Sequence, residues 1–432
     1  MANATLNAIE DDRTAPSARW YVLFVMTLIY TLNIADRFVV STLIEPIKTE
    51  FELSDAAVGV LTGAALAVFY VTAGIPLGMM ADRISRKRMI VASLAVWSVL
   101  TAICGLTRSY GQLLAMRIGV GVGEAGGTPP AQSLLADIFP AESRAFAMSL
   151  YALGAAAGAA LASVLGGLIA DSHGWRAVFI FFGLMGLPVA LLAALTVREP
   201  LRGRHDADDG SAAVPSFAEA IRIIRKSKPL THLLVGTAAI TFAGWGLVWW
   251  VPTFLLRSHG MSLQESGVVL GSMHGIGGVA VTMLTAWAMG AYAARGWRFQ
   301  SLFVAAVTAL VTIPAVIAFA TASKPLALAM LWIVVPSIYL YIGPTLGIAQ
   351  NLTPANMRGI VCALILFVAN AANLVIAPIL IGLLSDLVAP RVADPAESLR
   401  YVLTVMAFAG FWAAWHYLAA SRPSLTSEMP NP

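Results

Sequence analysis

The stretch TLIYTLNIADRFVVSTLI (residues 27–44) is apolar over most of its length, yet it contains Asp36 and Arg37 near its middle. A membrane-spanning helix needs about 20 mainly apolar residues. A charged side chain at the centre of such a helix costs roughly 2.5 to 3.5 kcal/mol, so it is kept where it faces a cavity or a partner. The stretch therefore predicts a spanning helix that carries a functional polar site.

The composition of the whole chain indicates a membrane protein. Of the 432 residues, 59% are hydrophobic and only 12% are charged, about half the charged fraction of soluble proteins. The net charge of +4 is small and the basic residues lie in short loops, so nucleic-acid binding is not expected. The two cysteines fall in apolar runs, and no cluster of ligands points to a metal or another cofactor.

Twelve apolar segments are long enough to span a bilayer and predict an all-α membrane protein. They are residues 19–45, 55–81, 89–107, 110–137, 144–171, 176–197, 229–256, 263–292, 299–322, 325–352, 358–388 and 399–420. We expect an N-terminal six-helix bundle with a cytoplasmic tail (1–197), a charged cytoplasmic linker (198–228), and a C-terminal six-helix bundle with a short cytoplasmic tail (229–432).

Three pairs of similar segments indicate that the halves are duplicates. FPAESRA (139–145) resembles TPANMRG (353–359), GGLIAD (166–171) resembles IGLLSD (381–386), and LSDAAVGVLTG (53–63) resembles MSLQESGVVLG (261–271). The pairs occur in the same order at nearly one offset. Such repeats are typical of secondary transporters, whose substrate site lies between the halves near the middle of the membrane.

The distribution of basic residues predicts the orientation. With the N-terminus inside, 18 of the 27 Lys and Arg fall in inner segments and seven in outer segments, while Arg37 and Arg117 lie within spans. Basic residues concentrate in cytoplasmic loops. Both termini are therefore expected in the cytoplasm.

Charges inside the spans are confined to the first and the fourth, with Asp36, Arg37, Arg117 and Glu124. Arg117 and Glu124 share one helix face about 10 Å apart, whereas the adjacent Asp36 and Arg37 point about 100° apart. We expect one of that adjacent pair to line a cavity and the other to pair with a neighbouring helix. The run GGTPP (126–130) is expected to interrupt the helix after Glu124.

These four groups sum to zero charge when all are ionised. Protonation of one carboxylate would release an arginine, which could then bind an anion. Asp36 and Glu124 are thus the candidate proton-coupling residues, and Arg37 and Arg117 the candidate anion-binding residues. The alternative is a structural ion pair that holds the two spans together.

The spans of the second half contain no Asp, Glu, Lys or Arg in their interiors. Aromatic, imidazole and amide side chains are the candidate substrate-binding residues there, and one asparagine of the first span joins them: Trp245, His274, Tyr341, Asn370, Asn373 and Asn33. His274 can also be read as a packed polar residue. A cavity that is charged on one wall and apolar on the other suits a molecule with an anionic end and an oily body.

The loop GMMADRISRKR (78–88) resembles the G-x-x-x-D-R-x-G-R-[KR] signature of the major facilitator superfamily, with Ser85 where that pattern has Gly. DRFVV (36–40) and RIGVGVGEAGGTPP (117–130), followed by DIFPAESRA (137–145), are similar to its Spinster-like branch. The resemblance implies two pseudo-symmetric six-helix bundles and proton-linked movement of lysolipids or sphingosine-phosphate-like lipids. It supports functional roles for Asp36, Arg37, Arg117 and Glu124, and a conformational latch of Gly78, Asp82, Arg83, Arg86 and Arg144.

The sequence thus predicts a monomeric transporter of the bacterial inner membrane that works by alternating access. The rival is the organic-anion symporter branch, which shares the D-R and R-x-x-x-G-x-x-E-A patterns and would carry sugar acids or aromatic acids. No nucleophile, metal or phosphate-loop pattern points to an enzyme.

Overall fold

The computed structural model describes residues 16–65, 84–200, 217–292, 295–353 and 357–422, with isolated positions at 68, 72, 77 and 80. These residues form helices and no β-strand, so the predicted all-α fold is confirmed. Contacts divide the chain into two compact units. One is formed by Met1–Val40 with Val68–Asp209, and the other by Ser41–Ala67 with Gly210–Pro432.

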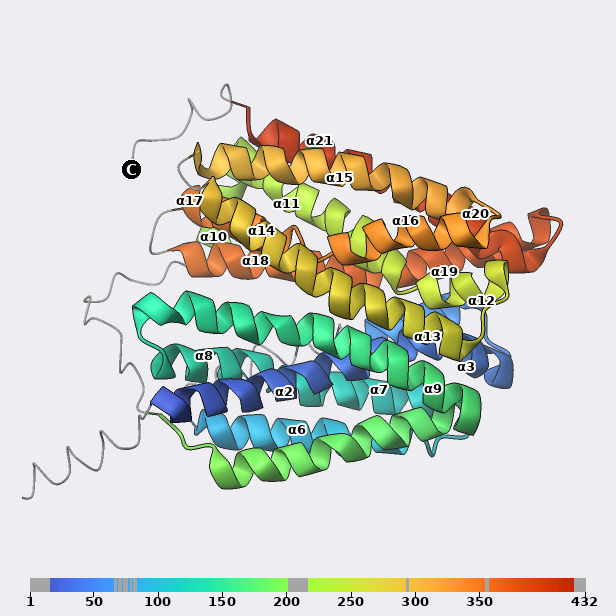
Figure 1. Cartoon of the computed structure of the whole chain (residues 1–432), viewed down its shortest axis with the longest axis horizontal. Coiled ribbons are helices and arrows are strands. Elements are labelled where there is room, and N and C mark those ends of the chain that lie inside the picture. Colours follow the sequence, from blue (N-terminus) through green and yellow to red (C-terminus); the bar gives the residue numbers. More distant parts are fainter. Residues whose placement is uncertain are drawn as a thin grey trace, which may run out of the picture. The chain divides into compact units, whose positions relative to one another are not determined.

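Among the described residues, the first unit contains five helical elements. They are α2 (Pro16–Thr42), whose last two residues belong to the second unit, α6 (Arg86–Cys104), α7 (Tyr110–Ala125), α8 (Thr128–Ile138) and α9 (Ala141–Thr196). The chain of α9 reverses at Gly174, where φ is 79°, and Figure 1 shows its two arms running in opposite directions. Glycine permits this conformation because it lacks a Cβ. The two arms are the predicted spans 144–171 and 176–197.

The first arm of α9 packs closely against α2. A Cβ placed on Gly158 would lie 2.4 Å from the backbone oxygen of Thr31 and 2.9 Å from the Cβ of Ile34. Small residues allow two helices to approach in this way. The glycine-rich sequence of the fifth predicted span therefore serves helix packing.

The second unit contains the remaining helices. They are α3 (Ile44–Phe51), α4 (Asp55–Gly59), η1 (Val60–Ala64), α10 (Phe217–Lys226), α11 (Lys228–Thr241), η2 (Phe242–Gly246), α12 (Val251–His259), α13 (Leu263–Ser272), η3 (Met273–Gly278), α14 (Val279–Ala291), α15 (Gly296–Ala320), α16 (Lys324–Ser337), α17 (Ile342–Asn351), α18 (Arg358–Asn370), η6 (Ala371–Ile376), α19 (Ala377–Val388), η7 (Ala389–Arg391), η8 (Pro395–Glu397), α20 (Ser398–Ala407) and α21 (Ala409–Ala420).

Within the described residues, eight helices are long and apolar enough to cross a membrane, or nine if α11–η2 and α12, bent by 45°, form one span. Local features explain why this number is below twelve. The two arms of α9 are taken together, and the fourth predicted span is divided into α7 and α8. Much of the second predicted span after Ala65 lies outside the described residues.

The structure supports the internal repeat at the ends of helices. Ser54 accepts a hydrogen bond from the first turn of α4, and Ser262 does the same for α13. Each of these helices continues into a π-helical turn, η1 in one case and η3 in the other. The segments LSDAAVGVLTG and MSLQESGVVLG thus have the same local structure.

A second pair of repeated segments makes the same contact. Arg144 donates from Nε to the carbonyl oxygen of Phe139 at 3.4 Å, and Arg358 donates from Nε to that of Thr353 at 3.3 Å. In both cases the arginine binds a carbonyl five residues earlier, next to the start of a helix. Duplicated halves explain why such a detail occurs twice.

Candidate functional site

Two ion pairs join α2 to α7 in the interior of the first unit. Arg37 Nε donates to Glu124 Oε2 at 2.7 Å, and Arg117 Nη1 donates to Asp36 Oδ2 at 3.0 Å. A hydroxyl of α6 completes the group, since Thr101 Oγ1 donates to Asp36 Oδ1 at 2.9 Å. The four charges predicted to act together therefore form one cluster, which we call the α2–α7 ion cluster.

The α2–α7 ion cluster is almost fully removed from solvent. The side chains of Arg117 and Glu124 are 0% exposed, that of Asp36 is 4% exposed, and that of Arg37 is 13% exposed. Both members of the adjacent pair bind α7, whereas the sequence suggested that only one would bind a neighbouring helix. Because they point in different directions, each reaches a different partner on that helix, and Arg37 retains the most exposure.

The break after Glu124 is present as predicted. Helix α7 ends at Ala125, and α8 begins at Thr128 with prolines in its first turn. Proline lacks the backbone N–H needed inside a helix but fits the first turn. Between the helices, Gly126 packs so closely on α6 that an added Cβ would lie 2.2 Å from Ser93 Oγ. The break thus ends α7 one residue after the carboxylate.

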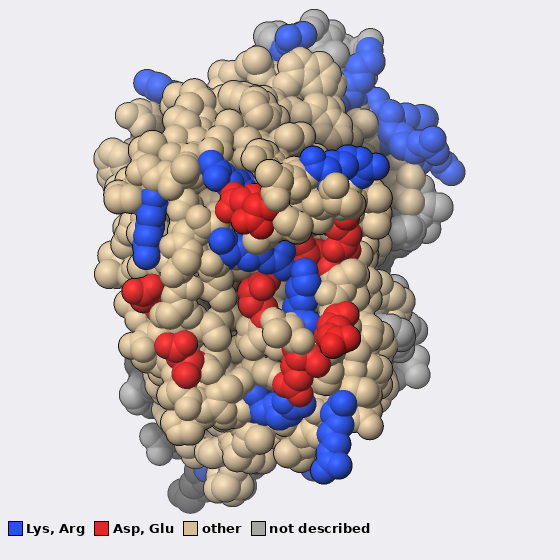
Figure 2. Space-filling view, turned by 90° about the vertical axis from the view of Figure 1, so that its right-hand side faces the viewer, with Lys and Arg blue, Asp and Glu red and all other residues tan. Residues whose placement is uncertain are grey.

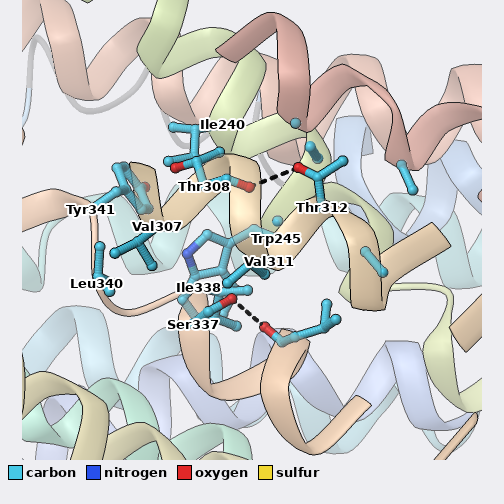
Figure 3. A pocket seen from close by; sticks show the side chains of 16 residues that line it. Ile240, Trp245, Val307, Thr308, Val311, Thr312, Ser337, Ile338, Leu340 and Tyr341 are labelled. Carbon is cyan, nitrogen blue, oxygen red and sulfur yellow. Dashed lines mark hydrogen bonds between the residues drawn. The ribbon is translucent and has the colours of Figure 1, made fainter. Parts of the chain in front are cut away.

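In the second unit, Trp245 and Tyr341 line a common cavity (Figure 3). Its other lining residues come mainly from α11, η2, α15 and α16, and most are aliphatic. The hydroxyls of Thr312 and Ser337 donate to backbone oxygens of their own helices. They offer few free hydrogen bonds, so the wall is chemically apolar.

The other candidates of the second half lie elsewhere. His274 is 1% exposed, and its Nδ1 is 3.0 Å from the hydroxyl of Tyr339. Tyr339 also packs edge-on against Trp245, with ring centroids 5.1 Å apart. Asn373 donates to the backbone oxygen of Ala369 within its own helical segment. Neither His274, Asn370 nor Asn373 lines the cavity of Trp245 and Tyr341.

The loop motif is described only in its last part. Gly78, Asp82 and Arg83 of the predicted latch lie outside the described residues. Arg86 is 3% exposed and donates from Nε to Glu199 at 2.9 Å; it also binds Asp137 and Ser133. All these contacts lie within the first unit. Arg144 binds the end of α8 there, as described above.

Glu199 shows how the environment of the motif acts on a carboxylate. Its partial burial raises the pKa, but hydrogen bonds from the Lys87 N–H, Arg86 and Ser85 lower it more, so the net pKa lies below the ordinary value. Such a group stabilises the fold above its unfolded-state pKa and loses this effect as the pH falls through the lowered value.

A second ion cluster, which was not predicted from the sequence, joins α3–α4 to α12 and α19 in the second unit. Arg257 donates two hydrogen bonds to Asp55, at 2.8 and 2.7 Å, and one to Glu45 at 2.8 Å. Asp386 accepts from the backbone N–H groups of Asp55 and Ala56. Lys48 completes this α3–α12 ion cluster by binding Asp55.

Figure 2 shows acidic and basic side chains intermingled on the face that carries α3 and α12. In sequence, Lys48 and Arg257 counted only as basic residues of outer segments. The available signal was the group of four acidic residues and one lysine over 45–55, where the first predicted span ends. Which distant charge each would meet was not visible, because that depends on how the helices pack.

The fold and the buried charges define a multi-pass membrane transporter. The sequence model of the Major Facilitator Superfamily matches residues 26–378, and the chain belongs to this family. It is similar over almost its full length to an MFS-type efflux pump of Mycolicibacterium smegmatis, with 31% identity over 97% of this chain and 96% of the relative.

The chain is also similar to Spinster-type transporters and to a sugar-acid transporter. A solved bacterial homologue of the human lysosomal transporter Spinster, inward-facing and unoccupied, superposes with a TM-score of 0.82 and 29% identity, covering 94% of this chain and 98% of that one. The zebrafish sphingosine-1-phosphate transporter is 27% identical over 53% of this chain and 46% of its own length. A probable galactarate/D-glucarate transporter of Bacillus subtilis is 26% identical over 59% and 61%.

Proposed function

We propose that this protein couples protons to the movement of an anionic amphiphile, such as a lysophospholipid or a sphingosine-phosphate-like lipid, by alternating access. The observation that carries the proposal is the α2–α7 ion cluster, in which two arginines and two carboxylates are paired and buried. Charges are costly inside a membrane protein, and they mark substrate and proton pathways there. We further propose that the protein works as a monomer in a bacterial inner membrane.

Proton coupling follows from the pairing. When Glu124 gains a proton, its attraction for Arg37 weakens, and the guanidinium becomes able to bind an anion. Protonation of Asp36 would act in the same way on Arg117. A guanidinium binds phosphate or carboxylate through paired N–H donors. The anionic end of the substrate would thus replace a carboxylate that has become neutral.

The apolar cavity of Trp245 and Tyr341 supports an amphiphile over a small diacid. Its hydroxyl groups are largely satisfied by their own helices, so a sugar acid would find few partners along this wall. A hydrocarbon chain would be stabilised by about 0.8 kcal/mol for each buried methylene. The similarity to a sphingosine-1-phosphate transporter agrees with this choice.

Small organic anions are the second candidate. The similarity to a probable galactarate/D-glucarate transporter favours them, and the arginines of the α2–α7 ion cluster would suit such a substrate equally well. The two candidates differ in what they require of the second half, since only the amphiphile uses an apolar cavity. This difference allows an experimental decision.

Binding of single-chain alkyl phosphates of increasing length to the purified protein tests the proposal. Affinity should rise by up to about fourfold for each added methylene, until the chain exceeds the cavity. Trp245→Ala should flatten this dependence, whereas Trp287→Ala, at an exposed tryptophan, should not. Arg117→Ala should weaken binding of all lengths alike. Affinity that is independent of chain length, with transport of sugar acids, would favour the second candidate.

A further inference from the structure

Asn33 of α2 is a buried amide whose hydrogen bonds are not satisfied by the protein. Its side chain is 2% exposed, and within the described part of the chain neither Oδ1 nor Nδ2 has a hydrogen-bond partner. A buried polar group without a partner costs about 1–3 kcal/mol. Native proteins generally avoid this cost by placing an ordered water at such groups.

The surroundings of Asn33 have room for such a water. The amide lines a small cavity, about the size of one water molecule, together with residues of α6, the α7–α8 turn, α8 and α9. The other lining residues are Ile29, Tyr30, Trp97, Gly127, Thr128, Ala131 and Tyr151. The cavity is too small for a substrate, so the candidate role of Asn33 as a substrate ligand does not fit its position in this structure.

Two of the residues that line this cavity, Asn33 and Gly127, lie near Glu124. Asn33 precedes Arg37 by one helical turn on the same face of α2, and Arg37 binds Glu124. Gly127, at the cavity wall, donates its backbone N–H to the backbone oxygen of Glu124 at 3.0 Å. The carboxylate oxygen Oε1 of Glu124 is also buried and has no partner among the described residues. Two buried polar groups, the Asn33 amide of α2 and Oε1 of Glu124 in α7, thus have no partner among the described residues.

We propose that Asn33 binds a water molecule in this cavity and that this water delivers the proton to Glu124. The inference rests on the proton coupling proposed above and adds the route. In the transfer, one O–H bond of the water breaks and one forms on Oε1 of Glu124. The water regains a proton from the solvent side, where Thr128 at the cavity wall is partly exposed.

The charged groups around Glu124 do not themselves take the role of the water that delivers the proton. Asp36 and Arg37 of α2 and Arg117 of α7 are held in the α2–α7 ion cluster, and the buried Cys104 of α6 lies within electrostatic reach of Arg117 and Asp36. An arginine does not give up its proton in a protein. A water fixed by the amide of Asn33, which both donates and accepts hydrogen bonds, is suited to passing protons in either direction.

The test needs no transported substrate. The purified protein is subjected to a rapid drop in pH, and the infrared absorption of the protonated carboxyl group is followed in time. The band of Glu124 is identified by its loss in Glu124→Gln. Asn33→Leu removes the amide at similar volume, and Ala131→Val fills the cavity without changing a polar group. Asn351→Leu, at an exposed asparagine of α17, serves as the control.

Asn33→Leu and Ala131→Val should each slow protonation of Glu124 by roughly tenfold or more, because the first removes the amide that holds the water and the second removes the space for it. The final extent of protonation should stay unchanged. An unchanged rate in both variants, with the Glu124 band intact, would overturn the water route alone. A changed extent at an unchanged rate would also overturn it, since the amide would then act only on the charge. Absence of any Glu124 band would overturn the route together with proton coupling at this residue.

Discussion

Glu124 has two carboxylate oxygens in unequal surroundings. One accepts a hydrogen bond from Arg37, while the other has no partner among the described residues. The carboxylate is therefore held in place by one oxygen and can be protonated on the other. Asp36 differs, because both of its oxygens accept hydrogen bonds, from Arg117 and Thr101. Glu124 thus has one oxygen open to a new partner, whereas neither oxygen of Asp36 is open.

We predict that Glu124→Gln folds and reaches the membrane but no longer responds to a proton gradient, because the amide keeps the shape and cannot titrate. Asp36→Asn should impair the response in the same direction. Transport into proteoliposomes with and without a pH gradient measures the effect, with Asp171→Asn at an exposed site of α9 as control. Wild-type pH dependence in both variants would move the proton site elsewhere, for instance to His274.

At the scale of elements, the contact between α2 and α9 depends on the missing side chain of Gly158. We predict that Gly158→Val destabilises the first unit by about 1–3 kcal/mol, since overpacking forces the helices apart. The position of the added Cβ, 2.4 Å from a backbone oxygen, leaves no flexible neighbour to move.

Thermal unfolding of the detergent-solubilised protein measures this effect. Gly111→Val is the matched control, because an added Cβ at Gly111 meets no atom within 4 Å. Equal stability of the Gly158 and Gly111 variants would show that the two helices separate without cost, in conflict with the packing described here.

The α3–α12 ion cluster ties the chain segment that follows α2 to helices from the second half of the sequence. Asp55 is 2% exposed and is paired with Arg257 through two hydrogen bonds and with Lys48. Removing one member of a buried pair costs about 3–5 kcal/mol, because the other charge is left unpaired. The partial exposure of Glu45 and Lys48 should place the cost here toward the lower end.

We therefore predict that Arg257→Gln and Asp55→Asn each speed hydrogen–deuterium exchange in residues 44–59. The double variant should exchange less fast than the sum of the two single effects predicts, since both changes remove the Asp55–Arg257 pair, while each also removes a contact of its own, to Glu45 or to Lys48. Lys324→Gln, at an exposed pair with Glu265, should leave exchange in this segment unchanged. Strictly additive effects of the two changes would rule out a direct coupling between Asp55 and Arg257.

At the scale of the whole molecule, orientation in the membrane is the prediction that depends least on side-chain geometry. The 18 to 7 distribution of Lys and Arg between inner and outer segments predicts that both termini and the linker lie in the cytoplasm. Reporter domains fused at residue 1, within 205–215, and at residue 432 should all report a cytoplasmic location. A single reporter found outside would be incompatible with twelve spans in this orientation.

Membership in a membrane transporter family, the approximate positions of the spans and the break after Glu124 could all be derived from the sequence. These features depend on residues close together in the chain. The length of an apolar segment determines whether it can span the membrane, and proline and glycine interrupt a helix. A charge inside an apolar span is costly, so it marks a functional site. The same reasoning singled out Asp36, Arg37, Arg117 and Glu124 before any contact between them was known.

Only the tertiary structure decided which groups meet. The sequence could not assign Arg37 to Glu124 and Arg117 to Asp36, because either pairing suits the spacing along each helix. Nor could the sequence predict that Asp55 binds Arg257, which is more than 200 residues away. It also could not show that Trp245 and Tyr341 line one cavity while His274 does not line it. Such contacts depend on how helices that are distant in the chain pack side by side. The periodic pattern within one helix shows which face is apolar, but it does not show which helices pack against that face.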